Sequence, residues 1–225
     1  MSIQRAACVF VCASIGFGAC ASSVETGPPI ADPASAAAGL LERSGPDAPS
    51  FVRFDWRYAD RRGNVEGDGV VRFNPPDSLR LDLFTSGDVA MAVALAGESL
   101  TSLGEIDDIE VPPRAFLFAM AGLFRPDSGD ARGFEAGRDT VFAYGAESER
   151  LYFFSRAGRL VKVEERRYGR LSRKVELAWG TDPDWPAEAE FRDLNEPSRV
   201  RWTIGQTRAL ETAHPSDIFT LPHAR

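Results

Sequence analysis

The sequence predicts a mainly β protein: a curled antiparallel sheet, or half-open β-barrel, of about 10–11 strands, with two or three short helices covering the concave side. Three observations support this prediction. Apolar and charged residues alternate from Phe51 onward, Gly- and Pro-containing turns separate the alternating runs, and one apolar segment around Phe116 has helical spacing instead. A sheet with one charged face must bury the other, and few helices are available, so we expect the sheet to curl.

Residues 1–19 are typical of a signal peptide that is removed from the mature chain. Arg5 supplies a positive start, and residues 6–19 are uncharged and largely apolar. This stretch is shorter than the ~20 apolar residues that a membrane span needs, and no later apolar stretch comes near that length. These residues are therefore excluded from the predicted fold.

The segment Phe17-Gly18-Ala19-Cys20 resembles the bacterial lipobox, in which small residues precede a cysteine that is lipidated and becomes the new N-terminus. The resemblance implies lipidation of Cys20. The alternative is an ordinary secretory signal peptide that has a cysteine near its end. Cys8 and Cys12 lie in the discarded part, so Cys20 is left alone and has no partner for an internal disulfide.

Residues 20–32 are small, polar and rich in Pro and Gly, a composition that predicts a flexible tether. Asp32 followed by Pro33 suits the N-cap and the first position of a helix, and Gly45-Pro46 suits its end. A short helix over residues 33–43 is therefore expected to open the folded domain, which we assign to residues 33–225.

The first strands form a predicted meander of three amphipathic runs, over residues 51–59, 65–73 and 79–83. A fourth run, over residues 89–96, alternates large apolar residues with alanines and carries no charge, so both of its faces can be buried. Further strand-like runs cover residues 132–136, 139–145, 149–156, 159–167, 171–179, 187–194, 198–205 and 207–213.

The segment from Val111 to Phe124 interrupts the strands. Phe116, Met120 and Leu123 recur at the spacing of one helical face, and prolines at the first turn are tolerated there. We predict a helix over residues 112–124. Because this helix is apolar nearly all round, it must be covered by the sheet, by a ligand or by a membrane.

The charge and the reactive residues argue against several functions. Without residues 1–19, which hold one arginine and no acid, 25 basic side chains face 33 acidic ones, which disfavours nucleic-acid binding. A Ser-His-Asp arrangement through His214 and Asp217 is conceivable, but no G-x-S-x-G elbow exists. The acidic run 105–110 lacks the spacing of a calcium loop. We predict no catalytic residue, no metal site and no cofactor.

Several loose motifs resemble those of the LolA and LolB lipoprotein-localisation factors and their DUF4292-like relatives. They are the helix at 33–43, the aromatic first strand, and the passage from Gly67-x-Gly69-x-Val71-x-Phe73 to Pro75-Pro76-x-x-Leu79-Arg80-Leu81. The Val-Pro-led helix and the closing Pro215-x-Asp217-x-Phe219-x-Leu221-Pro222 complete the likeness, which spans nearly all of the mature chain. The turn at residues 85–88 lacks the apolar tip of the LolB branch.

The resemblance implies a protein that binds acyl chains of lipoproteins or other lipids in an apolar cavity, as a carrier or acceptor. It implies an anchor in the outer membrane facing the periplasm, and a periplasmic carrier protein as a further partner. The alternative is an accessory lipoprotein of an envelope complex whose interior is filled by its own side chains. The predicted cavity residues are Phe54, Trp56, Tyr58, Val71, Phe73, Leu79, Leu81, Leu83, Met91, Val93, Leu95, Phe116, Met120 and Leu123.

Overall fold

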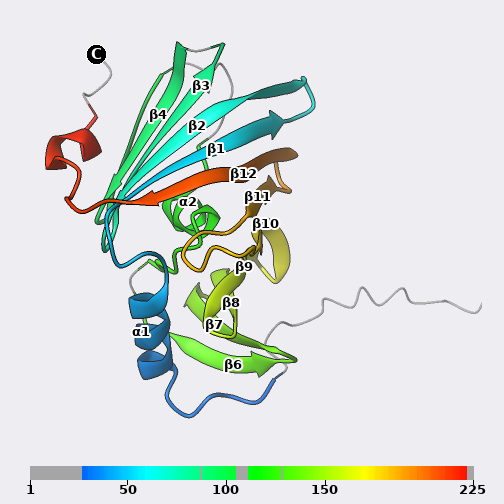
Figure 1. Ribbon diagram of the computed structural model, residues 1–225. Helices are drawn as coiled ribbons and strands as arrows, with labels where there is room; N and C mark the ends of the chain where they lie inside the picture. The colour runs from blue at the N-terminus through cyan, green and yellow to red at the C-terminus, as the bar shows by residue number, and fades with distance from the viewer. Residues whose placement is uncertain (1–26, 87, 105–110, 128, 222–225) are drawn as a thin grey trace, which may run out of the picture.

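A computed structural model describes residues 27–86, 88–104, 111–127 and 129–221; the predicted lipidation site Cys20 lies outside this part of the chain. The described strands form one antiparallel sheet in the order β5-β4-β3-β2-β1-β12-β11-β10-β9-β8-β7-β6 (Figure 1). The first five are β1 (Ser50–Ala59), β2 (Asn64–Asn74), β3 (Ser78–Thr85), β4 (Asp88–Ala96) and β5 (Ser99–Leu103). The others are β6 (Arg132–Ala136), β7 (Asp139–Ala146), β8 (Glu149–Arg156), β9 (Arg159–Arg167), β10 (Arg170–Ala178), β11 (Glu188–Asp193) and β12 (Ser198–Ala209).

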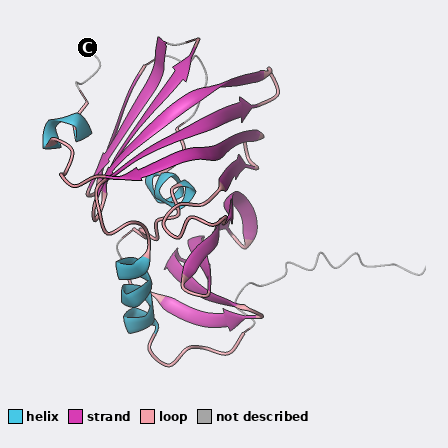
Figure 2. Cartoon of the chain, viewed as in Figure 1, coloured by secondary structure: helices cyan, strands magenta, loops and turns pink. Residues whose placement is uncertain are grey.

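The sheet consists of two meanders that meet at a single pair of strands. Strands β1–β5 follow one another in space as in sequence, and so do β6–β12. Pairing of β1 with β12 joins the two meanders, from Ser50 opposite Ala209 to Ala59 opposite Arg199. The sheet curls around a helix but is not closed into a barrel, because β5 and β6 remain its two edges (Figure 2). The predicted fold class is confirmed.

The first helix, α1 (Pro33–Arg43), has the bounds that the sequence predicts. The side chain of Asp32 caps it by accepting a hydrogen bond from the backbone N–H of Ser35 at 3.0 Å. Ala37 and Leu40 are the buried residues of this helix and belong to the main core. The helix therefore closes one end of the curled sheet.

The second helix, α2 (Arg114–Met120), is shorter than predicted and lies in the hollow of the sheet (Figure 1). Its end is set by Gly122, which has a φ of +80°. The N–H of Gly122 donates to the carbonyl of Ala119, and the N–H of Leu123 donates to the carbonyl of Phe118. This paired bonding with a left-handed glycine is the Schellman motif, which stops the helix although the apolar spacing continues to residue 124.

Glycines in β2 make room for the aromatic residues of β1. Gly69 lies opposite Phe54, and Gly67 lies opposite Trp56. A Cβ on Gly69 would come within 2.2 Å of the Phe54 ring. Phe54 in turn packs on Trp202 of β12, with ring centres 4.8 Å apart. The Gly-x-Gly motif thus lets two large rings seat beside the junction of the meanders.

Three further features differ from expectation or add to it. Strand β5 was not predicted, because its sequence Ser-Leu-Thr-Ser-Leu lacks both charge and a run of large apolar residues. Strand β12 runs unbroken to Ala209 through a bulge, where two separate strands were expected. The short C-terminal helix η1 (Ser216–Phe219) lies against β3 and β4. There Leu221 clusters with Ala92 and Ala94 on the face opposite the main core.

The start of the described chain runs along β6. Pro29 forms a bridge with Phe134, and the N–H of Ile30 donates to the carbonyl of Gly133 at 3.0 Å. The N–H of Glu135 donates to the carbonyl of Pro28, also at 3.0 Å. These contacts fix residues 28–30 of the predicted tether to the edge of the sheet. In the described part of the chain, no helix has the length and hydropathy to cross a membrane.

We expect Gly69→Ala to destabilise the protein by about 1–3 kcal/mol, because the new methyl group would overlap the Phe54 ring. Denaturant unfolding followed by tryptophan fluorescence measures this change. The control is Gly205→Ala in β12, where a Cβ would make an ordinary contact of 3.7 Å with the carbonyl of Arg53. Equal stability of the Gly69→Ala variant and the parent chain would refute the packing argument.

Candidate functional site

The predicted cavity residues all lie in one place. Each of the fourteen belongs to the main core cluster, and Tyr58, at 7% exposed, is the most accessible of them. Strand alternation turns the members from β1 to β4 toward the hollow, and Phe116, Met120 and Leu123 approach from the α2 segment. The structure therefore brings together the residues that the sequence selects, on the concave face of the sheet.

Side chains of the protein itself occupy this concave space. All α2 residues from Ala115 to Met120 are buried, at 2% exposure or less. Phe116 packs edge-on against Phe191 of β11, with ring centres 5.4 Å apart. Past the helix, Phe124 packs against Phe153 of β8 at 5.0 Å. The interior of the curled sheet, which we call the cup, is thus apolar, and α2 fills it.

The predicted cavity residues omit the part of the interior that lies on the second meander. The second meander contributes the buried residues Phe142, Tyr144, Phe153, Leu160, Val163, Val175, Ala189, Phe191, Val200 and Trp202. In β7 and β8 both faces are apolar, because Val141, Tyr152 and Phe154 form a separate cluster on the outer face. Alternation alone could not say which residues point inward. The available signal was the high aromatic content of these two strands.

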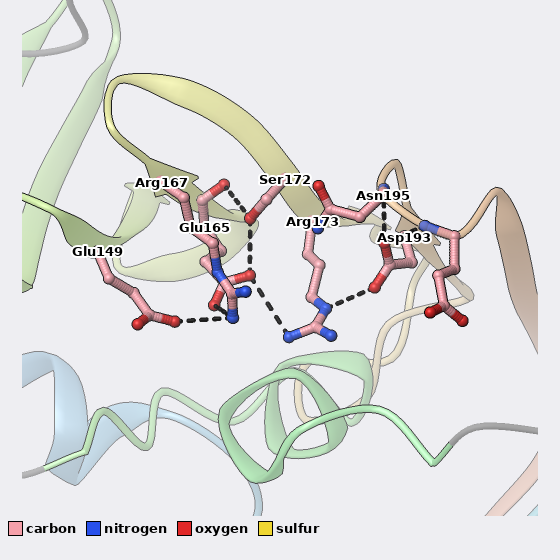
Figure 3. Close-up of polar contacts among 8 residues, drawn as sticks. Glu149, Glu165, Arg167, Ser172, Arg173, Asp193 and Asn195 are labelled. Carbon is pink, nitrogen blue, oxygen red and sulfur yellow. Dashed lines mark hydrogen bonds and ion pairs between the residues drawn. The ribbon is translucent and has the colours of Figure 1, made fainter.

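A polar network closes one margin of the concave face (Figure 3). Arg173 of β10 donates through Nε to Asp193 Oδ2 at 2.6 Å, and its Nη1 lies 3.6 Å from Glu165 Oε2. Ser172 donates to the same Glu165 oxygen at 2.7 Å. Arg167 donates to the other Glu165 oxygen at 3.4 Å and to Glu149 at 2.9 Å. Figure 3 shows these side chains directed toward the α2 segment.

The buried carboxylate of Asp193 is held in the charged form. Asp193 is 3% exposed and Glu165 is 5% exposed. Burial by itself would raise the pKa of Asp193, but hydrogen bonds from Arg173 and from the backbone N–H groups of Glu196 and Asn195 lower it below its ordinary value. A cleft of about 330 Å³ separates the network from Phe116 and Ala115 of α2. The margin of the cup is thus polar on one wall and apolar on the other.

A larger cleft, of about 610 Å³, lies between the end of α1, the turn before β3 and the segment after α2. Arg125 forms part of its wall and connects these three elements. Its guanidinium donates to the carbonyl of Pro76 at 2.7 Å and to Ser44 Oγ at 2.8 Å. Burial lowers the pKa of Arg125 from its ordinary value. Because these hydrogen bonds tie the guanidinium to neighbouring protein groups, we interpret Arg125 as a structural link.

The residues weighed for catalysis are placed as follows. His214 Nε2 lies 3.0 Å from the carbonyl oxygen of Ser50, and its backbone N–H donates to the side chain of Asn74. Its ring packs against Phe219, with ring centres 6.4 Å apart. These contacts hold the His214 ring between the start of β1 and the C-terminal helix η1. Among the described residues, no group of three His, Cys, Asp or Glu side chains is placed to hold a metal ion.

Comparison with solved structures defines the class of fold. A LolA superfamily protein from Nitrosomonas europaea matches with a TM-score of 0.53 and 13% identity, covering 83% of this chain and 96% of that one. A putative outer membrane lipoprotein-sorting protein domain from Vibrio parahaemolyticus matches with a TM-score of 0.55 and 10% identity, covering 82% and 94%. A DUF1329 family protein from Desulfovibrio piger gives 0.53 and 10%, covering 84% and 98%.

At these identities the likeness shows the fold alone. No protein-family model matches the chain, and no curated protein matches it in sequence. The described chain has the LolA-like fold, which it shares with the LolA superfamily protein and with the lipoprotein-sorting domain. The sequence-level resemblance to this superfamily is therefore confirmed at the level of structure.

We expect Asp193→Asn to cost about 2 kcal/mol at pH 7, because it removes the charge from buried hydrogen bonds while keeping the shape. The folded pKa of Asp193 is depressed, so its contribution is present above the unfolded pKa of about 3.9 and is lost as the pH falls through the folded value. The difference between variant and parent should therefore shrink below about pH 4.

Urea unfolding across a pH series tests this expectation, with the exposed Asp217→Asn as the control. A difference that persists unchanged at low pH would show that Asp193 acts through shape and not through charge.

Proposed function

We propose that this chain is a non-catalytic lipoprotein of the cell envelope that binds acyl chains of lipoproteins or other lipids inside the curled sheet, as a carrier or acceptor. One observation carries the proposal: the concave face of a LolA-like sheet is apolar over most of its area and holds one short apolar helix. Transfer of an acyl chain into such a space is favourable by about 0.8 kcal/mol per buried CH₂, so binding needs no covalent step.

Since α2 fills the space, an acyl chain must take its place. The side chains of α2 from Ala115 to Met120 are all apolar, so they hold the helix by packing. The hydrogen-bonding side chains lie at the two ends of the segment: Arg114 donates to the carbonyl of Gly97 at 2.8 Å, and Arg125 donates to Pro76. Exchange of the helix for an acyl chain therefore replaces one set of apolar contacts with another.

The same packing favours a second candidate function. An interior that is already filled is also what an accessory lipoprotein of an envelope complex would have, with its outer surface carrying the interactions. The two functions differ in one measurable property. A carrier takes up lipid when α2 is weakened, whereas an accessory protein only loses stability.

We further propose that Cys20 carries lipid and holds the domain at the outer membrane, facing the periplasm. The lipobox-like segment before Cys20 supports the anchor. Ala21 and Ser22 support the outer membrane, because they lack the Asp that retains lipoproteins at the inner membrane of enteric bacteria. A periplasmic carrier protein is then the expected source of the cargo.

Acyl binding is tested by native mass spectrometry of the Cys20→Ala chain, purified without detergent and mixed with fatty acid. We expect bound fatty acid, and tighter binding by the double variant Phe116→Ala/Met120→Ala, because truncation of two buried α2 side chains empties part of the cup. Phe154→Ala is the control, because it removes a buried ring from the cluster on the outer face.

The outcomes separate the two candidates. Uptake that is enhanced by the α2 variant but not by Phe154→Ala supports the carrier. A clean apo mass for the parent chain and for both variants would exclude acyl binding and leave the accessory role.

Lipidation is tested by expression in a bacterium with labelled palmitate. We expect label in the parent chain, no label in Cys20→Ala, and unchanged labelling of Cys12→Ala, because Cys12 lies within the segment that is removed. Secretion of an unlabelled parent chain would show that residues 1–19 are an ordinary signal peptide.

A further inference from the structure

A group of arginines surrounds one aromatic ring on the convex face of the sheet. The guanidinium carbons of Arg53, Arg72 and Arg208 lie 5.9, 5.9 and 5.6 Å from the centre of the Phe51 ring. These four residues come from β1, β2 and β12, on both sides of the junction between the meanders. The ring lies within the range at which cations are attracted to an aromatic face.

Strand register explains this gathering. Phe51 of β1 lies opposite Arg208 of β12 on one side and opposite Arg72 of β2 on the other. Arg72 lies opposite Arg80 of β3. The strand neighbours of Phe51, Arg72 and Arg80 are buried in the core, and Arg208 is paired opposite Phe51, so these side chains share the outer face. We define Phe51, Arg53, Arg72, Arg80 and Arg208 as the arginine patch.

The patch is positively charged although the chain as a whole is acidic. Arg72 and Arg80 both pair with Asp82, a buried carboxylate. Within the part of the chain that the structure describes, Arg53 and Arg208 form no ion pair. The four arginines of the patch therefore have one paired carboxylate, Asp82, among them, although the formal net charge of the chain is −7. On the same face, β1 continues from Arg53 to Asp55, and β2 continues from Arg72 through Val70 to Asp68, so the positive charge is confined to one end of this face.

We propose that the arginine patch docks the domain on a bilayer that contains anionic phospholipid. Charge complementarity favours such a surface, because each Lys or Arg near an anionic leaflet strengthens binding about fivefold. The half-buried ring of Phe51 at the centre adds apolar surface, which suits the boundary between the headgroups and the acyl chains. Arg53, Arg208 and Phe51 line none of the clefts described above, so the patch offers a broad surface and not a shaped pocket.

This proposal is independent of acyl binding, since the patch lies on the face of the sheet opposite the α2-filled interior. The patch residues alternate with core residues along their strands: Phe51 and Arg53 flank the buried Val52. Docking through the convex face would leave the concave face and its polar margin directed away from the bilayer. Membrane contact and cargo exchange would then use different sides of the sheet.

Co-sedimentation with vesicles tests the proposal, with a chain that begins at Ala21 and so keeps every described element. We expect binding to phosphatidylglycerol/phosphatidylcholine vesicles at low salt, loss of that binding at high salt, and no binding to phosphatidylcholine alone. Arg53→Gln/Arg208→Gln should weaken binding about 25-fold, as the product of two fivefold losses.

The matched control is Arg57→Gln/Arg201→Gln. Arg57 and Arg201 lie opposite each other on the same two strands, but each pairs with a glutamate, Glu66 and Glu188 respectively. This variant removes the same charge and should bind the vesicles nearly as well as the parent chain.

Two results would overturn the proposal: absence of parent binding to the anionic vesicles, or equal loss in both double variants. Capture of an acidic protein without vesicle binding would also overturn it and would assign the patch to a protein partner. Fatty-acid uptake by the Arg53→Gln/Arg208→Gln variant should equal that of the parent chain. Measuring it therefore separates membrane docking from the proposed carrier function.

Discussion

A single curled sheet must bury one apolar face, and it does so through its own curvature, the seven-residue helix α2 and the buried side of α1 at one end. Phe116 reaches Phe191 of β11, and Phe124 reaches Phe142 and Phe153, so the α2 segment touches strands from the second meander along its length. Because burial of apolar area is the dominant favourable term in folding, this seating of α2 holds the curvature of the sheet.

The elements with strong local signals could be predicted from the sequence. Asp32 and Pro33 define the start of α1, and Gly45-Pro46 define its end. The alternation in β1 and β3 identifies those strands and their inward faces. Helix α2 was expected to be longer, because the apolar spacing continues past Gly122 and does not show that the positive φ of this glycine ends the helix. Strand β5 was not predicted, because its sequence Ser-Leu-Thr-Ser-Leu does not alternate between apolar and charged residues. Its place in the sheet comes from pairing with β4.

The sequence predicts the residues that line the first half of the candidate site, but not that α2 fills it. Leu79, Leu81 and Leu83 could be placed inward from their neighbours Arg80 and Asp82. The aromatic residues of β7 and β8 could not, since both faces of those strands are buried. Whether α2 covers the hollow or fills it depends on the width of the hollow. That width is set by strands far apart in the sequence, so no local sequence pattern encodes it. The network of Glu165, Arg173 and Asp193 likewise depends on register across three strands.

The pairing of residues 28–30 with β6 sets how far the domain can travel from an anchor at Cys20. The contour of the chain from Cys20 to Gly27 is at most about 25 Å, since an extended residue spans roughly 3.3–3.6 Å. A lipid on Cys20 would thus hold the β6 edge within a short radius of the bilayer, much closer than a leash of the whole 20–32 segment would. If the proposed anchor holds, the domain would pivot within this radius and could not leave the membrane surface, so a carrier of this kind would need its cargo brought to it.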